Sequence, residues 1–193
     1  MPLIFSLILA TSLADQPVLD VYLPHFNDRQ ANRSFGRARA IVDAAYAEIG
    51  LRVTWHFTAS LPPDCGKGPR RRQIVFELLT GPATGRSATA LAAAKPYSQQ
   101  GPCITLLMDR FQASAVQNPE TTGMLMGHVI AHEIGHVLQG VDRHSETGLM
   151  KERWSAQEIK EMWRTRLRFT PYDAELILAS FGNDLPVTLS AVK

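Results

Sequence analysis

Apolar residues alternate or cluster in four short runs upstream of Asp109. Each run is bounded by glycine, proline or polar residues, a pattern that predicts β-strands. The four predicted strands cover residues 18–23, 51–57, 73–79 and 103–108. A fifth strand, short and at the edge of the sheet, is expected near residues 87–93, within a stretch rich in glycine, alanine, serine and threonine.

Four further segments have apolar residues at helical spacing or carry residues that start helices. The four predicted helices cover residues 32–49, 121–139, 155–166 and 170–180. Gly50 ends the first of them, and Ser155 and Glu158 form a capping box at the start of the third. Strands and helices in this order indicate one α/β (α+β) domain over residues 15–193, in which the later helices carry the chemistry.

The first 14 residues have the pattern of an export signal. Residues 3–13 are almost wholly apolar, and Ser12-Leu13-Ala14 offers the small residues that signal peptidases accept. The run is too short to span a bilayer comfortably and no other segment is long enough, so no stable membrane span is expected. No lysine or arginine precedes the run, which leaves a buried N-terminal strand as the alternative.

Charge and cysteine content narrow the range of partners and compartments. The net charge is only +2, from 20 basic and 18 acidic residues, and this excess is too small to suggest nucleic acid. The one basic run, Arg70-Arg71-Arg72, is interpreted as an exposed loop end, with an anion or substrate patch as the alternative. In an oxidising compartment Cys65 and Cys103 are compatible with one disulfide or with two separate thiols.

Two histidines and a glutamate in the predicted helix 121–139 have the spacing of a metal site. His132 and His136 are four residues apart, so their imidazoles leave the same helix face one turn apart. Two neutral imidazoles at this spacing can bind one Zn²⁺, and Glu133 suits a carboxylate that takes a proton from zinc-bound water. The flanking residues are apolar, as a buried catalytic helix requires.

His144 supplies a third nitrogen shortly after this helix. Three protein ligands leave a fourth position for water, which is the coordination of a catalytic zinc and not of a structural one. His128, one turn before His132, is interpreted either as a group behind the ligands or as an ordinary helix residue. His25 and His56 are not assigned to the metal.

This segment resembles the metzincin metallopeptidases, whose motif is His-Glu-x-x-His-x-x-Gly-x-x-His followed by a turn that contains a methionine. His132, Glu133 and His136 match directly, and residues 144–150, His-Ser-Glu-Thr-Gly-Leu-Met, are similar to the matrixin-type continuation. The resemblance implies a metzincin-like zincin fold, with a twisted mixed sheet whose antiparallel edge strand lines the cleft. It also implies that Met150 lies beneath the zinc as a hydrophobic floor.

The third metal ligand departs from the family spacing. Gln139 stands where the family has glycine and Asp142 stands where it has the third histidine, so His144 comes two residues late. We favour His144 because the serine, glycine and methionine of the continuation are in register with it, and Asp142 remains the alternative. A gluzincin arrangement, with Glu158 or Glu161 as the third ligand, is a second alternative.

The expected function is zinc-dependent hydrolysis of peptide bonds by a secreted or periplasmic enzyme. His132, His136 and His144 are expected to bind the metal, and Glu133 to assist attack by the zinc-bound water. We expect a monomer that binds a peptide or protein substrate in extended form along the edge strand. A secreted metal-binding or protein-binding module without catalysis is the alternative, although such a module has no need of Glu133.

Overall fold

Six stretches of the chain are described by the computed structural model. They are residues 16–26, 29–58, 73–81, 90–95, 103–114 and 118–182. The predicted export signal, the Arg70-Arg71-Arg72 run and Cys65 lie outside the described residues. Cys103 is disulfide-bonded. Among the described helices, none combines the length and the apolar character that crossing a membrane requires.

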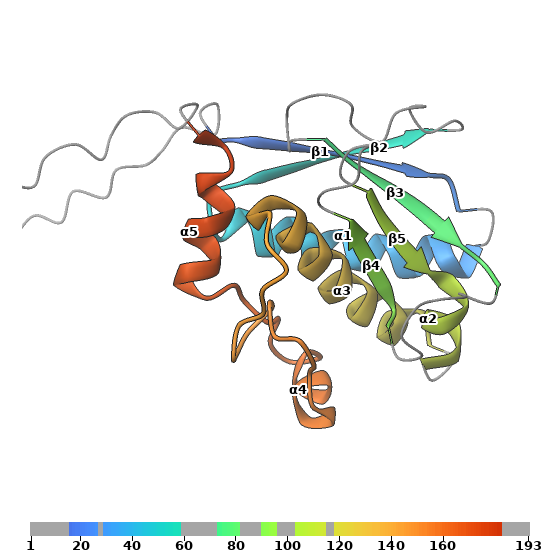
Figure 1. The fold of residues 1–193 in the computed structure, drawn as a ribbon. Helices are drawn as coiled ribbons and strands as arrows, with labels where there is room; N and C mark the ends of the chain where they lie inside the picture. Colours follow the sequence, from blue (N-terminus) through green and yellow to red (C-terminus); the bar gives the residue numbers. More distant parts are fainter. Residues whose placement is uncertain are drawn as a thin grey trace, which may run out of the picture.

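Five strands form one mixed sheet in the order β2-β1-β3-β5-β4 (Figure 1). The strands are β1 (Val18–Pro24), β2 (Arg52–Thr58), β3 (Gln73–Leu79), β4 (Ala92–Lys95) and β5 (Cys103–Leu107). The β1, β2, β3 and β5 strands pair in parallel, and β4 pairs with β5 in the antiparallel direction. The expected mixed sheet with an antiparallel edge strand is therefore confirmed.

The edge strand overlaps the end of the region near residues 87–93 where the sequence predicts it and continues to Lys95, while residues 82–89 lie outside the described residues. The β4 strand pairs Ala92 with Leu106 and Ala94 with Ile104. Three of its four residues are alanine, which has little preference for strands, so the local pattern does not define where the strand begins. Its bounds come from pairing with β5, which the sequence pattern does not reveal.

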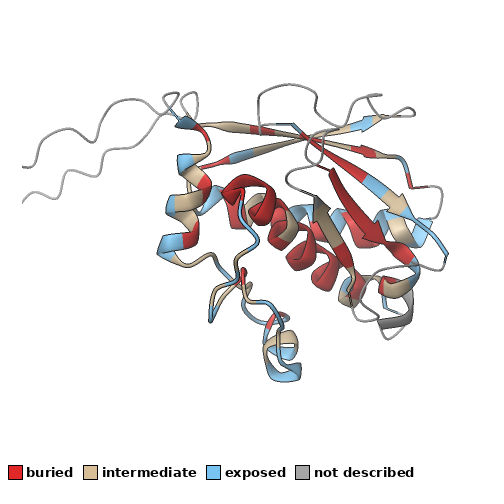
Figure 2. Ribbon diagram, in the orientation of Figure 1, coloured by how far each residue is buried: buried red, intermediate tan, exposed pale blue. Residues whose placement is uncertain are grey.

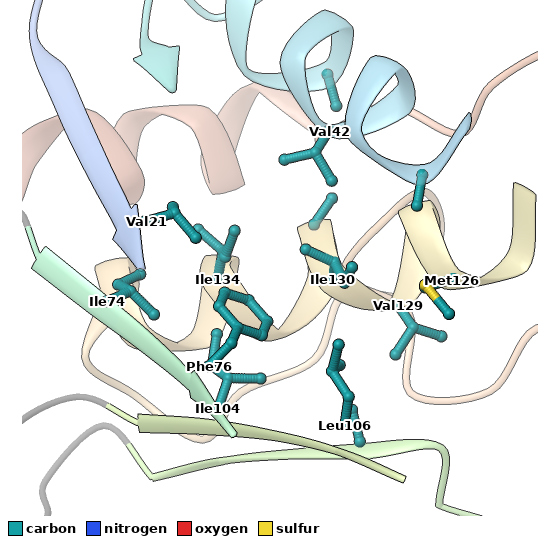
Figure 3. Packing of buried hydrophobic residues seen from close by; sticks show 14 of the residues in the cluster. Val21, Val42, Ile74, Phe76, Ile104, Leu106, Met126, Val129, Ile130 and Ile134 are labelled. Carbon is teal, nitrogen blue, oxygen red and sulfur yellow. The ribbon is translucent and has the colours of Figure 1, made fainter. Parts of the chain in front are cut away.

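Two long helices cover one face of the sheet, α1 (Arg29–Ala47) and α3 (Pro119–Gln139) (Figure 1). The core lies between this face and the two helices. Figure 3 shows Ile74 and Phe76 of β3 facing Ile130 and Ile134 of α3, with Val42 of α1 above them. Alternate residues of the central strands point toward the helices, which is why the apolar residues of β1 recur with a period of two.

The α3 helix is buried on nearly all sides, as the red colour of its ribbon in Figure 2 shows. Asn118 caps its first turn by accepting a hydrogen bond from the Glu120 amide at 2.9 Å, and Pro119 occupies the first helical position. Gly140 ends it in the left-handed conformation, with φ of 64°. The helix that carries the predicted site is thus fixed at both ends.

The remaining helices differ in part from the sequence prediction. No element is predicted between residues 109 and 120, yet α2 (Met108–Ser114) follows β5 directly and buries Phe111. The α4 helix (Ala156–Glu161) has the expected capping box but ends before the predicted Arg166. Further along the chain, the Leu167 amide and the Arg168 carbonyl bond to other segments and not within a helix. The α5 helix (Pro171–Ala179) agrees with its prediction.

Two glycines of α3 let α1 approach it closely. A Cβ atom at Gly127 would lie 2.8 Å from the Ala38 carbonyl oxygen and 2.8 Å from the Ile41 Cβ atom. A Cβ atom at Gly123 would meet the Ser34 carbonyl oxygen in the same way. Because the obstacles are backbone and Cβ atoms, a larger residue at either position must push the two helices apart.

Replacing Gly127 with alanine is expected to lower the free energy of unfolding by about 1–3 kcal/mol, the usual range for overpacking. The loss should appear although alanine favours helix over glycine by roughly 1 kcal/mol. Gly36 of α1 is the matched control, because a Cβ atom there meets nothing within 4 Å. Gly36→Ala should therefore stabilise the protein. Denaturant unfolding measures both variants, and a Gly127→Ala protein as stable as the wild type would contradict this packing.

Candidate metal centre

Three histidine side chains converge at the C-terminal half of α3. The Nε2 atoms of His132 and His136 are 2.9 Å apart, and those of His136 and His144 are 3.2 Å apart. Each of the three offers one ligand atom, and these atoms all lie within 4.8 Å of one another. His132 and His136 are buried on the helix, whereas His144 is exposed on the loop that follows it. The structure therefore brings together the three residues that the sequence analysis selects.

The protonation of the two buried imidazoles leaves nitrogen lone pairs facing each other. The Nδ1 atom of His132 donates to the Leu149 carbonyl at 2.8 Å, and that of His136 faces the Val141 carbonyl at 3.4 Å. Burial lowers the pKa of His132 to about 4 and also lowers the pKa of His136, so both rings are neutral at neutral pH. With its proton on Nδ1, each ring presents Nε2 as an acceptor. Acceptor atoms this close repel unless a cation lies between them, so the donor set fits a metal ion.

The loop that carries His144 is tied to neighbouring segments on its downstream side. The Ser145 amide donates to the Met150 carbonyl at 2.8 Å, and the Leu149 amide donates to the Arg168 carbonyl at 2.8 Å. Gly148 takes a φ of 78°, a conformation that side chains other than glycine rarely adopt. The Leu149 carbonyl also accepts the His132 hydrogen bond. These contacts therefore link the loop both to α3 and to the segment after α4.

Met150 lies against the segment of α3 between the two helical histidines. It is fully buried, and a Cβ atom at Gly135 would come within 2.5 Å of its sulfur. Gly135 is thus the residue that makes room for the methionine, which explains a glycine inside an otherwise apolar helix.

Glu133 faces the edge strand. Its half-buried carboxylate accepts a hydrogen bond from the Ala94 amide of β4. The pKa of Glu133 is raised to about 7, mainly by burial; the Ala94 bond opposes this rise and the nearby charge of Asp142 adds to it. The glutamate next to the first histidine is therefore a carboxyl group whose proton affinity is close to neutral pH.

Beside Glu133, some backbone groups of the edge strand β4 point outward, away from its neighbour β5. The Leu107 amide donates to the Leu91 carbonyl at 2.9 Å, and the register pairs Ala93 with Thr105. In an antiparallel ladder, hydrogen-bonded pairs alternate with pairs that are not hydrogen-bonded. Because Leu91 bonds to Leu107, the next bonded pair is Ala93 with Thr105, and the backbone groups of Ala92 and Ala94 are directed away from β5. Glu133 thus lies at the outward edge of the sheet that the structure describes.

The alternative ligands lie outside the histidine cluster. Asp142 is exposed and is not among the grouped residues. Glu158 accepts two hydrogen bonds from the Lys151 ammonium at 2.8 Å each and one from the Ser155 amide. Glu161 accepts a hydrogen bond from the Gln157 side chain at 2.6 Å. Among the described residues, no acidic group joins the three nitrogens.

The other histidines have partners of their own. His128 donates from Nδ1 to the Met124 carbonyl at 2.8 Å, and its Nε2 accepts the Leu167 amide at 3.2 Å. Both ring nitrogens are therefore used to join α3 to the segment after α4, so His128 has a structural role. His56 is hydrogen-bonded to Asp20 at 2.7 Å, away from the cluster.

Two further residues lie near the site and are not part of the sequence motif. The Trp154 ring lies edge-on to His132, with 5.8 Å between ring centroids. Asp173 of α5 is fully buried and accepts hydrogen bonds from Arg143 and Ser145, the two neighbours of His144. The only local signal for Asp173 is its place three residues after Thr170, which predicts a helix cap and nothing more.

Comparison with known proteins shows the fold. No protein-family model matches the chain, and no curated protein has a significantly similar sequence. Among solved structures, it is similar to the archaemetzincin of Methanopyrus kandleri, with a TM-score of 0.52 and 15% sequence identity. The match covers 87% of this chain and 97% of that protein. The chain therefore has a mixed α/β fold of the archaemetzincin type, which confirms the expected fold class.

Proposed function

We propose that this protein is a zinc-dependent metallopeptidase. The observation that carries the proposal is the convergence of three imidazole Nε2 atoms within 4.8 Å, next to a glutamate with a raised pKa. The archaemetzincin-type fold supports it, because the solved relative bears the name of a metzincin. A structural zinc site would be completed by a fourth protein ligand. Among the described residues the cluster has three, as in catalytic sites.

In this proposal His132, His136 and His144 hold the zinc ion. Burial keeps the first two neutral, and hydrogen bonds from Nδ1 direct Nε2 toward the shared centre. When bound, zinc would supply a Lewis acid that polarises the scissile carbonyl and acidifies a water molecule. Met150 forms the apolar support of this centre, since it is buried against the helix turn between the histidines.

Glu133 is proposed as the general base and then the general acid. Its carboxylate accepts the proton of the attacking water and later gives it to the leaving amine. A pKa of about 7 suits both steps, because the group can gain and lose a proton near neutral pH. The hydrogen bond from Ala94 orients the carboxylate at the edge of the sheet.

The substrate is proposed to be a peptide in extended form, added to β4 as a further strand. The outward backbone groups of Ala92 and the Ala94 carbonyl offer hydrogen bonds that such an addition uses, whereas the Ala94 amide is already bonded to Glu133. A peptide along this edge would pass beside Glu133, because that carboxylate bonds to the Ala94 amide.

Digestion of a peptide library tests the proposed activity. The purified protein is expected to cleave peptides, to lose activity in the presence of a chelator and to regain it when zinc is restored. Calcium added in place of zinc serves as the control, since imidazole nitrogen is a poor ligand for calcium. Absence of cleavage by a protein that contains one zinc per chain would instead indicate a metal-binding module.

We further propose that the protein acts outside the cytosol. The apolar N-terminal run with its small-residue end supports export. The disulfide bond of Cys103 also supports an oxidising compartment.

A further inference from the structure

A buried carboxylate lies behind the loop that carries His144. The side chain of Asp173, in the first turn of α5, has no exposed surface. Its Oδ1 atom accepts hydrogen bonds from Arg143 Nη1 at 2.8 Å and from Ser145 Oγ at 2.7 Å. The arginine also donates to Ser145 Oγ at 3.2 Å, so the three side chains bond to one another.

The other oxygen of this carboxylate is held by α5 itself. Asp173 Oδ2 accepts hydrogen bonds from the Thr170 amide at 3.1 Å and from Thr170 Oγ1 at 2.7 Å. Hydrogen bonds to the carboxylate outweigh the effect of burial, which alone would raise the pKa of Asp173, so the pKa lies below its ordinary value. Asp173 is therefore charged at neutral pH and rigidly placed, and it can fix whatever bonds to its Oδ1 atom.

The residues fixed in this way are the two neighbours of His144. In an extended chain successive side chains point to opposite sides, so residues 143 and 145 share one side and residue 144 faces the other. Arg143 and Ser145 both point to Asp173. His144 points instead to His136, with 3.2 Å between the Nε2 atoms.

His144 needs such support more than the other two histidines do. His132 and His136 are buried on a capped helix, whereas His144 is exposed on a loop without regular secondary structure. Gln139, the residue that occupies the glycine position of the metzincin motif, is buried, and its Nε2 atom lies 3.5 Å from Asp173 Oδ1. Gln139 and the two neighbours of the late His144 thus all lie against the same carboxylate oxygen, Asp173 Oδ1.

We propose that Asp173 is a positioning residue, which holds His144 in the metal-binding geometry through Arg143 and Ser145. This inference rests on the proposed zinc site. It explains how a third histidine two residues later than the family spacing reaches the other two. Hydrogen bonds from Arg143 and Ser145 to Asp173 fix the longer loop to α5 on both sides of His144. The loop therefore has a defined position despite its two additional residues.

Asp173→Asn tests the proposal, because asparagine keeps the size of the side chain and removes its charge. The zinc dissociation constant, measured by competition with a chromogenic chelator, is expected to rise about 10–100-fold, the range for loss of a group that orients a metal ligand. X-ray absorption at the zinc edge should show fewer than three imidazole ligands per zinc. A metal site that still has three imidazoles and wild-type affinity would overturn the proposal.

Ile177→Val separates positioning from simple stability. Ile177 is a fully buried residue of α5, and its side chain takes no part in the hydrogen bonds of Asp173. The variant removes one buried methyl group, so it should lower the melting temperature yet change zinc affinity less than about twofold, well below the range for an orienting group. An equal loss of zinc affinity in Ile177→Val and Asp173→Asn would mean that α5 stability alone governs the site, against the proposal.

Arg143→Gln keeps the test decisive if Asp173→Asn does not fold. Arg143 is partly exposed, so its replacement leaves the core intact. Zinc affinity is expected to fall on the order of tenfold, and unchanged affinity would overturn the proposal. Zinc binding is measured without any peptide, so a wild type that binds zinc but cleaves nothing contradicts the peptidase function and leaves this inference open to the same test. A wild type that binds no zinc overturns both.

Discussion

Replacing Glu133 with glutamine is expected to lower peptide hydrolysis by about 10²–10⁴-fold, the contribution of a positioned general base. Glutamine has nearly the same shape and its amide oxygen can still accept the Ala94 hydrogen bond. It cannot accept the proton of the attacking water. Because the three imidazoles are untouched, the variant should contain as much zinc as the wild type. Turnover of a defined peptide and zinc content per chain measure the two effects.

Glu146→Gln is the control for this substitution. Glu146 is exposed on the loop after His144 and stays outside the histidine cluster. Its replacement makes the same chemical change a short distance away and should leave turnover unchanged. Full activity in Glu133→Gln would show that another group moves the proton. Loss of zinc in Glu133→Gln would show that the carboxylate is part of the metal site.

The second large effect is expected from His144→Ala, which should weaken zinc binding by more than about 100-fold. Loss of a group that only orients a ligand already costs about 10–100-fold, and loss of the ligand itself costs more. Wild-type protein at a zinc concentration of 100 times its dissociation constant gains about 2.7 kcal/mol of stability. The zinc-dependent rise in melting temperature should therefore largely disappear in the variant.

Asp142→Ala is the matched control for the third ligand. Asp142 is exposed and lies at the standard family spacing, but the three convergent nitrogens come from other residues. Asp142→Ala should keep both zinc and the thermal shift. Zinc retained in His144→Ala and lost in Asp142→Ala would make the aspartate the third ligand. Zinc lost in Glu158→Ala or Glu161→Ala would indicate the downstream-glutamate arrangement.

Much of the fold follows from local patterns along the chain. The strands β1, β2, β3 and β5 are predicted because half-buried or fully buried strands concentrate apolar residues. The sequence does not predict the α2 helix, because seven residues with one buried aromatic ring give no clear helical period. The predicted third helix extends past the end of α4 at Glu161, and the residues just beyond it, Leu167 and Arg168, bond to distant segments instead. Tertiary contacts of this kind leave no trace in local spacing.

The residues of the candidate site likewise fall into two groups, those that local sequence patterns predict and those that only tertiary packing brings together. His132, Glu133 and His136 are found from sequence because helix geometry converts a spacing of four into a shared face. His144 is found because residues around it are in register with a known motif. Asp173 is 28 residues beyond Ser145, and only the packing of α5 against the loop brings them together. No local rule connects two such positions.

The outer edge of β4 has a consequence beyond the proposed binding of a peptide. Outward-facing backbone groups at a sheet edge will pair with any extended chain, including segments of another copy. The brevity of β4, four residues, and the use of its Ala94 amide by Glu133 limit how many bonds a foreign strand can make there. The short edge that we propose for peptide binding is therefore also poorly suited to pairing between copies of the chain, which limits aggregation through β4.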